Sequence, residues 1–106
     1  MNLGIILETK EPEKAWNAFR FANQALVREH KVKMFLMGEA VECENINNPQ
    51  FNIVEEMRKF ITTSGILLAC GTCLTSRIMD NYTSCNISTM NDCVELVEWA
   101  DKVVTF

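Results

Sequence analysis

The sequence predicts an α/β fold in which helices cover both faces of a parallel sheet. Short apolar runs alternate along the chain with longer segments of helical periodicity, the pattern of β-α units. Runs such as residues 66–69 are apolar throughout, which is typical of strands buried on both faces. A chain of 106 residues is expected to form one domain, residues 1–106.

The first strand is expected over residues 3–7 and the first helix over about residues 13–29. Thr9 or Glu11 lies near the start of this helix, and Pro12 suits its first turn. Small and large apolar residues recur within the helix at helical spacing, which predicts one buried face. The second strand is expected over residues 31–37, where an apolar centre is closed by Gly38.

The middle of the chain begins with a loop, residues 39–50, with a short helical turn over residues 39–41. Asn52 can cap a helix over residues 53–63, which Gly65 then stops. The third strand, residues 66–69, leads directly into Cys70 at its end. The remaining elements are expected to be a short helix over 72–79, a turn over 80–84, a strand over 85–88, a helix from 90 or 91 to 100, and a strand over 102–106.

Composition argues against several classes of partner and site. The net charge is −4 and basic residues do not cluster, so a nucleic-acid partner is not expected. No apolar run approaches a membrane span, and the N-terminus has no basic leader, so we expect a cytoplasmic protein. The chain has five cysteines but one histidine, His30, which disfavours a mixed Cys/His metal site. We expect no metal and no cofactor.

Cys70, Cys73 and Arg77 form the most promising site. Cys70 falls where a predicted parallel strand ends, which is the edge at which ligands and chemistry gather in open α/β sheets. If a helix begins there, positions 70, 73 and 77 share one face, and Arg77 could approach a thiolate at Cys73. Such a pair is suited to thiol exchange or sulfur transfer, whereas Cys70 as a small buried core residue is the alternative.

The other cysteines have simpler interpretations. Cys43 lies in a polar loop and is expected to be an exposed, incidental thiol. Cys93 falls on the apolar face of the last helix and is expected to pack in the core. Cys85 is expected in a loop that gathers at the same sheet edge as Cys70.

With these residues assembled, the chain resembles the DsrE/DsrF-like family, and most closely its YchN-like branch. The resemblance rests on stretches that occur in family order and span nearly the whole chain. They are the segment from Val32 to Val41, Phe51-Asn52-Ile53, Cys70-Gly71-Thr72-Cys73 with Arg77, and the C-terminal segments from Val94 to Trp99 and from Asp101 to Phe106. One departure is Ile78, which stands after Arg77 where the family commonly has glycine.

The resemblance implies a three-layer α/β/α sandwich with a mostly parallel five-stranded sheet, assembled as a homo-oligomer, a trimer or hexamer. It also implies a sulfur carrier that holds a persulfide on Cys70, with Cys73 as the second cysteine and Arg77 as the basic residue. Sulfur donor and acceptor proteins would be its partners. The alternatives are a thiol–disulfide redox protein that uses Cys70 and Cys73, and a non-enzymatic oligomeric module.

Overall fold

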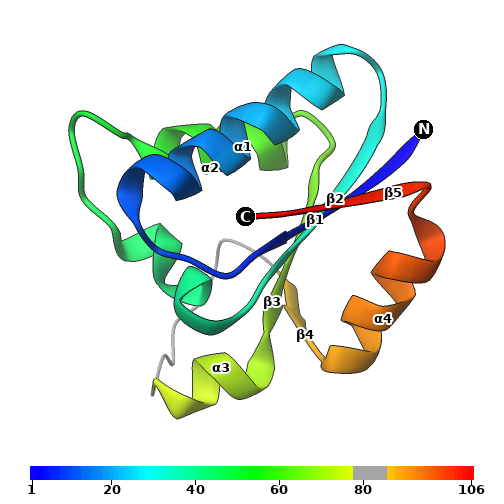
Figure 1. Cartoon of the computed structure of the whole chain (residues 1–106). Helices are drawn as coiled ribbons and strands as arrows, with labels where there is room; N and C mark the ends of the chain where they lie inside the picture. Colours follow the sequence, from blue (N-terminus) through cyan, green and yellow to red (C-terminus); the bar gives the residue numbers. More distant parts are fainter. Residues whose placement is uncertain (78–85) are drawn as a thin grey trace.

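Strands and helices alternate along the chain in the computed structural model, which describes residues 1–77 and 86–106 (Figure 1). The strands are β1 (Asn2–Leu7), β2 (Lys31–Leu36), β3 (Ile66–Cys70), β4 (Asn86–Ser88) and β5 (Lys102–Thr105). The helices are α1 (Pro12–Val27), the 3₁₀ helix η1 (Gly38–Asn45), α2 (Ile53–Thr62), α3 (Gly71–Ser76) and α4 (Met90–Trp99). The predicted α/β class is confirmed.

The five strands form one sheet in the order β4-β3-β2-β1-β5, and every neighbouring pair is parallel. Helices α1 and α2 lie side by side against one face, and α4 lies on the other (Figure 1). The expected three-layer sandwich is therefore present, with a sheet that is parallel throughout. Because all strands run the same way, β2 and β3 present their carboxyl ends at one edge of the sheet.

The core lies mainly between the sheet and the α1/α2 layer. Leu3, Ile5 and Leu7 alternate along β1 and are fully buried, since successive strand residues point to opposite faces. On the opposite face, Gly4 lets α4 approach the strand closely: a Cβ atom there would lie 2.6 Å from Cδ2 of Leu96. A side chain at position 4 would therefore push α4 away from the sheet.

The capping predictions for the first two long helices are confirmed. Glu11 is the N-cap of α1, where its carboxylate accepts hydrogen bonds from the backbone N–H groups of Glu13 and Lys14, at 3.3 and 2.9 Å. Asn52 caps α2 by accepting a hydrogen bond of 3.1 Å from the Glu55 N–H. These side chains satisfy donors that a helix start would otherwise leave unpaired.

Two segments differ from the sequence prediction. The expected loop over 39–50 contains a longer 3₁₀ helix, η1, which Gly38 opens by taking a φ of +56°, a conformation favoured by glycine. Helix α3 ends at Ser76 rather than at 79, and Arg77 is its C-cap. Residues 78–85 lie outside the described residues, and so do the predictions on Ile78, on Cys85 and on the turn over 80–84.

Candidate functional site

The site begins with two cysteines at the carboxyl end of β3, an interior strand of the sheet. Cys70 is the last residue of β3 and the N-cap of α3, and Cys73 lies one helical turn further on. Cys70 is only 3% exposed, whereas Cys73 is partly exposed. The structure thus gives the two thiols different access to solvent, a difference that their sequence spacing does not reveal.

Cys73 and Cys93 both lie near the thiol of Cys70. Burial raises the pKa of the Cys70 thiol; the backbone N–H of Cys73 opposes this effect, and hydrogen bonding with the Cys73 side chain adds to it. Burial also raises the pKa of Cys93 on α4, and the nearby charge of a Cys70 thiolate raises it further. Cys93 is buried, as expected, but it also lies near the site, which the sequence did not indicate.

Cys73 has a polar partner that the sequence analysis did not identify. The backbone N–H of Gly38, at the start of η1, donates a hydrogen bond to the Cys73 Sγ at 3.2 Å. A donor aimed at sulfur stabilises negative charge on that sulfur. The carboxyl end of β2 therefore supplies a group to the cysteine that follows β3, as expected for neighbouring parallel strands.

Arg77 connects α3 to η1 through its guanidinium group. Its Nε donates to Oε2 of Glu42 at 2.8 Å, and one terminal nitrogen donates to the backbone carbonyl of Cys73 at 3.2 Å. Lys10 approaches the other Glu42 oxygen at 3.3 Å. The hydrogen bond from Arg77 lowers the pKa of the Glu42 carboxyl, as does Lys10. Arg77 thus contacts the backbone carbonyl of Cys73. Glu42 belongs to the site as well, although the sequence analysis did not identify it.

The prediction that Cys43 is an exposed thiol is wrong. Cys43 is fully buried on η1, because the segment expected as a polar loop folds into a helix against the core. Burial, with a smaller contribution from the charge of Glu42, raises the pKa of Cys43 to about 12. A thiol that stays protonated and buried is inert, so Cys43 is a structural residue.

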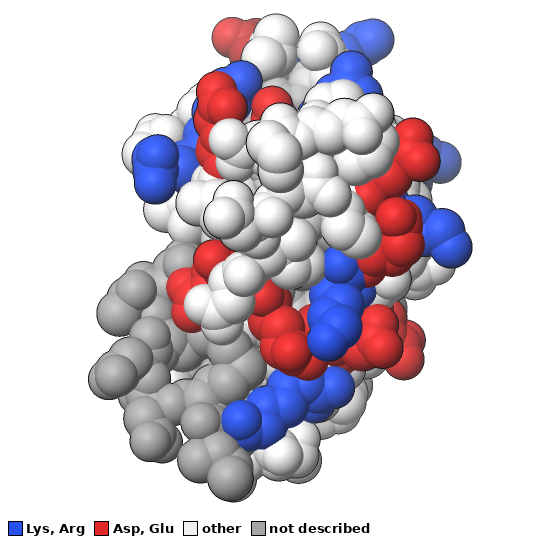
Figure 2. Space-filling model, turned by 90° about the vertical axis from the view of Figure 1, so that its left-hand side faces the viewer, with Lys and Arg blue, Asp and Glu red and all other residues white. Residues whose placement is uncertain are grey.

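Charged side chains of both signs mix on the face that carries η1 and the nearby ends of α1 and α2. Figure 2 shows acidic side chains gathered around basic ones on this face. The ion pairs of Glu42 with Lys10 and Arg77 belong to this mixed pattern. Basic side chains do not form a continuous patch on the visible part of this face.

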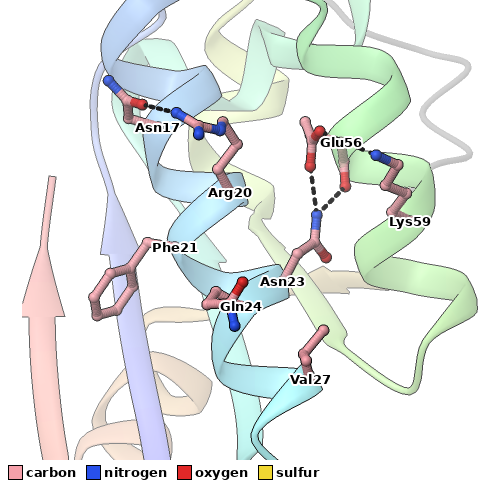
Figure 3. Close-up of a pocket in the computed structure, with 8 residues that line it drawn as sticks. All are labelled: Asn17, Arg20, Phe21, Asn23, Gln24, Val27, Glu56 and Lys59. Carbon is pink, nitrogen blue, oxygen red and sulfur yellow. Dashed lines mark hydrogen bonds and ion pairs between the residues drawn. The ribbon is translucent and has the colours of Figure 1, made fainter.

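A cavity of about 560 Å³ opens between α1 and α2 (Figure 3). Asn23 on α1 connects the two helices beside the cavity. Its amide nitrogen donates to the Glu56 carboxylate at 2.8 Å and to the Glu56 carbonyl at 3.0 Å. None of the described residues that line the cavity is a cysteine. The size of a cavity therefore does not point to the cysteine pair in this molecule.

The part of the chain that the structure describes has neither a metal-binding cluster nor a membrane-spanning helix. Within residues 1–77 and 86–106, no three His, Cys, Asp or Glu side chains gather in a way that could hold a metal ion. Over the same ranges, every helix is too short or too polar to cross a bilayer.

Comparisons with known proteins agree with this fold. The family model of the DsrE/DsrF-like family matches residues 1–106. An uncharacterized protein of Methanocaldococcus jannaschii is 31% identical, over 89% of this chain and 88% of the relative. An uncharacterized protein of Methanopyrus kandleri is 33% identical, over 89% of this chain and 83% of the relative.

A solved structure shares the architecture. The conserved protein of unknown function from Bacteroides thetaiotaomicron superposes with a TM-score of 0.82, covering 99% of this chain and 94% of its own. Its sequence identity is 16%, so the likeness concerns the fold. The match of the family model to the full length, together with relatives above 30% identity, shows that this chain belongs to the DsrE/DsrF-like family.

Proposed function

We propose that this protein is a cytoplasmic sulfur carrier of the YchN-like branch that holds a persulfide on Cys70. The observation that carries the proposal is the thiol pair at the carboxyl end of β3, in which a shielded Cys70 lies beside a more accessible Cys73. Membership in a family linked to sulfur relay supports this assignment. Burial suits a holding site, because it keeps solvent and free thiols away from the bound sulfur.

Loading is an exchange between sulfur atoms. A protein thiolate forms a bond to the outer, sulfane sulfur of a donor persulfide, and the S–S bond of the donor breaks. The donor leaves as a thiolate, and no external oxidant or reductant is consumed. The protein needs only an accessible thiolate and a protected resting place, so the absence of a histidine from the described site is compatible with the reaction.

Arg77 has a positioning role in this proposal. Its hydrogen bonds to the Cys73 carbonyl and to Glu42 tie the end of α3 to η1. The same tie keeps the Gly38 N–H directed at the Cys73 sulfur. The guanidinium therefore acts on the thiol pair by fixing the geometry of its supports.

The test is to locate sulfur after loading. The reduced protein is incubated with glutathione persulfide until the reaction is complete, alkylated and digested with trypsin, and the fragment from Phe60 to Arg77 is analysed by tandem mass spectrometry. We expect the mass of one extra sulfur atom on Cys70, removable by dithiothreitol. Protein that gains no sulfur on Cys70 at equilibrium contradicts the proposal.

The same thiol pair favours a second candidate, a reversible Cys70–Cys73 disulfide that exchanges electrons with other dithiols. The loading experiment separates the two. A fragment that loses two hydrogen atoms and gains no sulfur would favour the redox function. A fragment that is unchanged would favour a non-enzymatic module.

The carrier is proposed to work as a homo-oligomer, a trimer or hexamer. Helix α4 supports this assignment, because Met90, Val94 and Val97 recur along one side and are 55%, 54% and 45% exposed. Covering such side chains with another copy would remove apolar surface from water. We expect sedimentation equilibrium to give three or six times the chain mass, and a monomeric or dimeric mass would contradict the assembly.

A further inference from the structure

We propose that sulfur enters this protein at Cys73 and is then passed inward to Cys70. This inference rests on the proposed carrier function and adds a route to it: Cys73 is the thiol that meets the donor, and Cys70 is the thiol that stores the sulfur. It also assigns a role to the Gly38 N–H, which holds the Cys73 sulfur in position for its reaction with the donor.

Access to the two sulfurs is the first argument. Cys70 is the last residue of β3 and is only 3% exposed, and Ala69 just before it is fully buried. A donor persulfide is attached to a protein chain or to a tripeptide such as glutathione. Its outer sulfur must come within bonding distance of the attacking thiol, and the attached chain needs room. Cys73 is partly exposed on α3 and can meet such a donor without any opening of the core.

The support around Cys73 is the second argument. Its sulfur accepts the Gly38 N–H at 3.2 Å, and its carbonyl accepts hydrogen bonds from the Ser76 hydroxyl at 2.9 Å and from Arg77 at 3.2 Å. The N–H holds the sulfur in position, and the two bonds to the carbonyl fix the backbone that carries it. Burial, by contrast, disfavours a negative sulfur at Cys70. Cys73, which is accessible and held in position, is therefore the thiol of the pair that is placed to react first.

The contact between the two thiols provides the transfer step. Cys73 first takes the sulfane sulfur from the donor and becomes a persulfide. The Cys70 sulfur then bonds to that outer sulfur, the bond between it and Cys73 Sγ breaks, and the Cys70 proton passes to Cys73. Atoms and electrons balance within the pair, and the reverse exchange returns the sulfur to the surface for an acceptor.

The experiment follows the order of labelling. Wild type, Cys73→Ser and Cys70→Ser are mixed with glutathione persulfide, quenched with iodoacetamide at successive times, and mapped by tandem mass spectrometry. We expect wild type to carry sulfur first on Cys73 and later on Cys70. Cys70→Ser should accept sulfur on Cys73 and retain it there, and Cys73→Ser should load Cys70 at least tenfold more slowly.

Cys93→Ala is the matched control, because it also removes a buried cysteine near Cys70 and should load like wild type. The ordering measured in wild type needs no substitution, so it stands even if a variant folds poorly. Sulfur that reaches Cys70 at the wild-type rate in Cys73→Ser, or that appears on Cys70 first in wild type, would overturn the relay and leave the carrier function intact. Wild type that takes up no sulfur would overturn both.

Discussion

The Phe60→Ala variant is expected to lose about 3–5 kcal/mol of its free energy of unfolding. Phe60 is fully buried on α2, and its ring meets the ring of Phe19 on α1 edge to face, with centroids 6.1 Å apart. The ring also rests against the backbone of Gly65, where a Cβ atom would lie 2.5 Å from it. Because Gly65 has no side chain, no atoms there can move in to fill the space that the ring leaves.

Urea denaturation followed by circular dichroism measures this loss. Domains of this size have total stabilities of roughly 5–15 kcal/mol, so the variant would be close to unfolding. Phe21→Ala is the matched control, because it removes the same atoms from a helix position that is 44% exposed. Equal losses in the two variants would show that Phe60 does not hold α2 against α1 in the way described.

Much of the fold follows from local sequence signals. Apolar runs predict strands, and the caps at Glu11 and Asn52 are read directly from residue types that accept backbone hydrogen bonds. The strand order is harder to predict, because it depends on which runs pair across the sheet. The sequence placed Cys70 at the end of a strand, and only the sheet reveals that the preceding strand ends beside it.

Only part of the site could be predicted, because some of its contacts also join distant segments of the sequence. The spacing of Cys70, Cys73 and Arg77 follows from one helical segment and can be read from the chain. Gly38 and Glu42 contact Cys73 and Arg77 across 35 residues of sequence, and no local pattern indicates such contacts. The available clue was the expected position of the Gly38 segment, at the carboxyl end of the second strand.

Cys43 shows how a polar sequence can conceal a buried residue. Its neighbours Glu42 and Glu44 are charged, and the residues that follow are turn formers, so the local composition is that of a loop. Burial instead follows from the 3₁₀ helix, which turns Cys43 together with Ala40 and Val41 toward the core. The consequence is a thiol whose protonation differs between the folded and unfolded chain.

Stability is therefore expected to fall in alkaline solution through Cys43. In the unfolded chain this thiol loses its proton near its ordinary pKa of 9.0, whereas the folded protein keeps the proton up to about 12. Between these values the unfolded state binds fewer protons, so the free energy of unfolding decreases as the pH rises. The contribution is fully present below pH 9. Its loss amounts to about 1.4 kcal/mol per pH unit, or roughly 4 kcal/mol over the whole range.

The effect is isolated by comparing wild type with Cys43→Ala in urea titrations at a series of pH values. All other ionisable groups are the same in the two proteins, so their contributions cancel in the difference. The alanine variant has a small cavity whose cost does not depend on pH. Its stability deficit should therefore shrink, and then reverse, as the pH rises from 9 toward 12. A deficit that stays constant across this range would mean that Cys43 ionises alike in both states, which its complete burial on η1 does not allow.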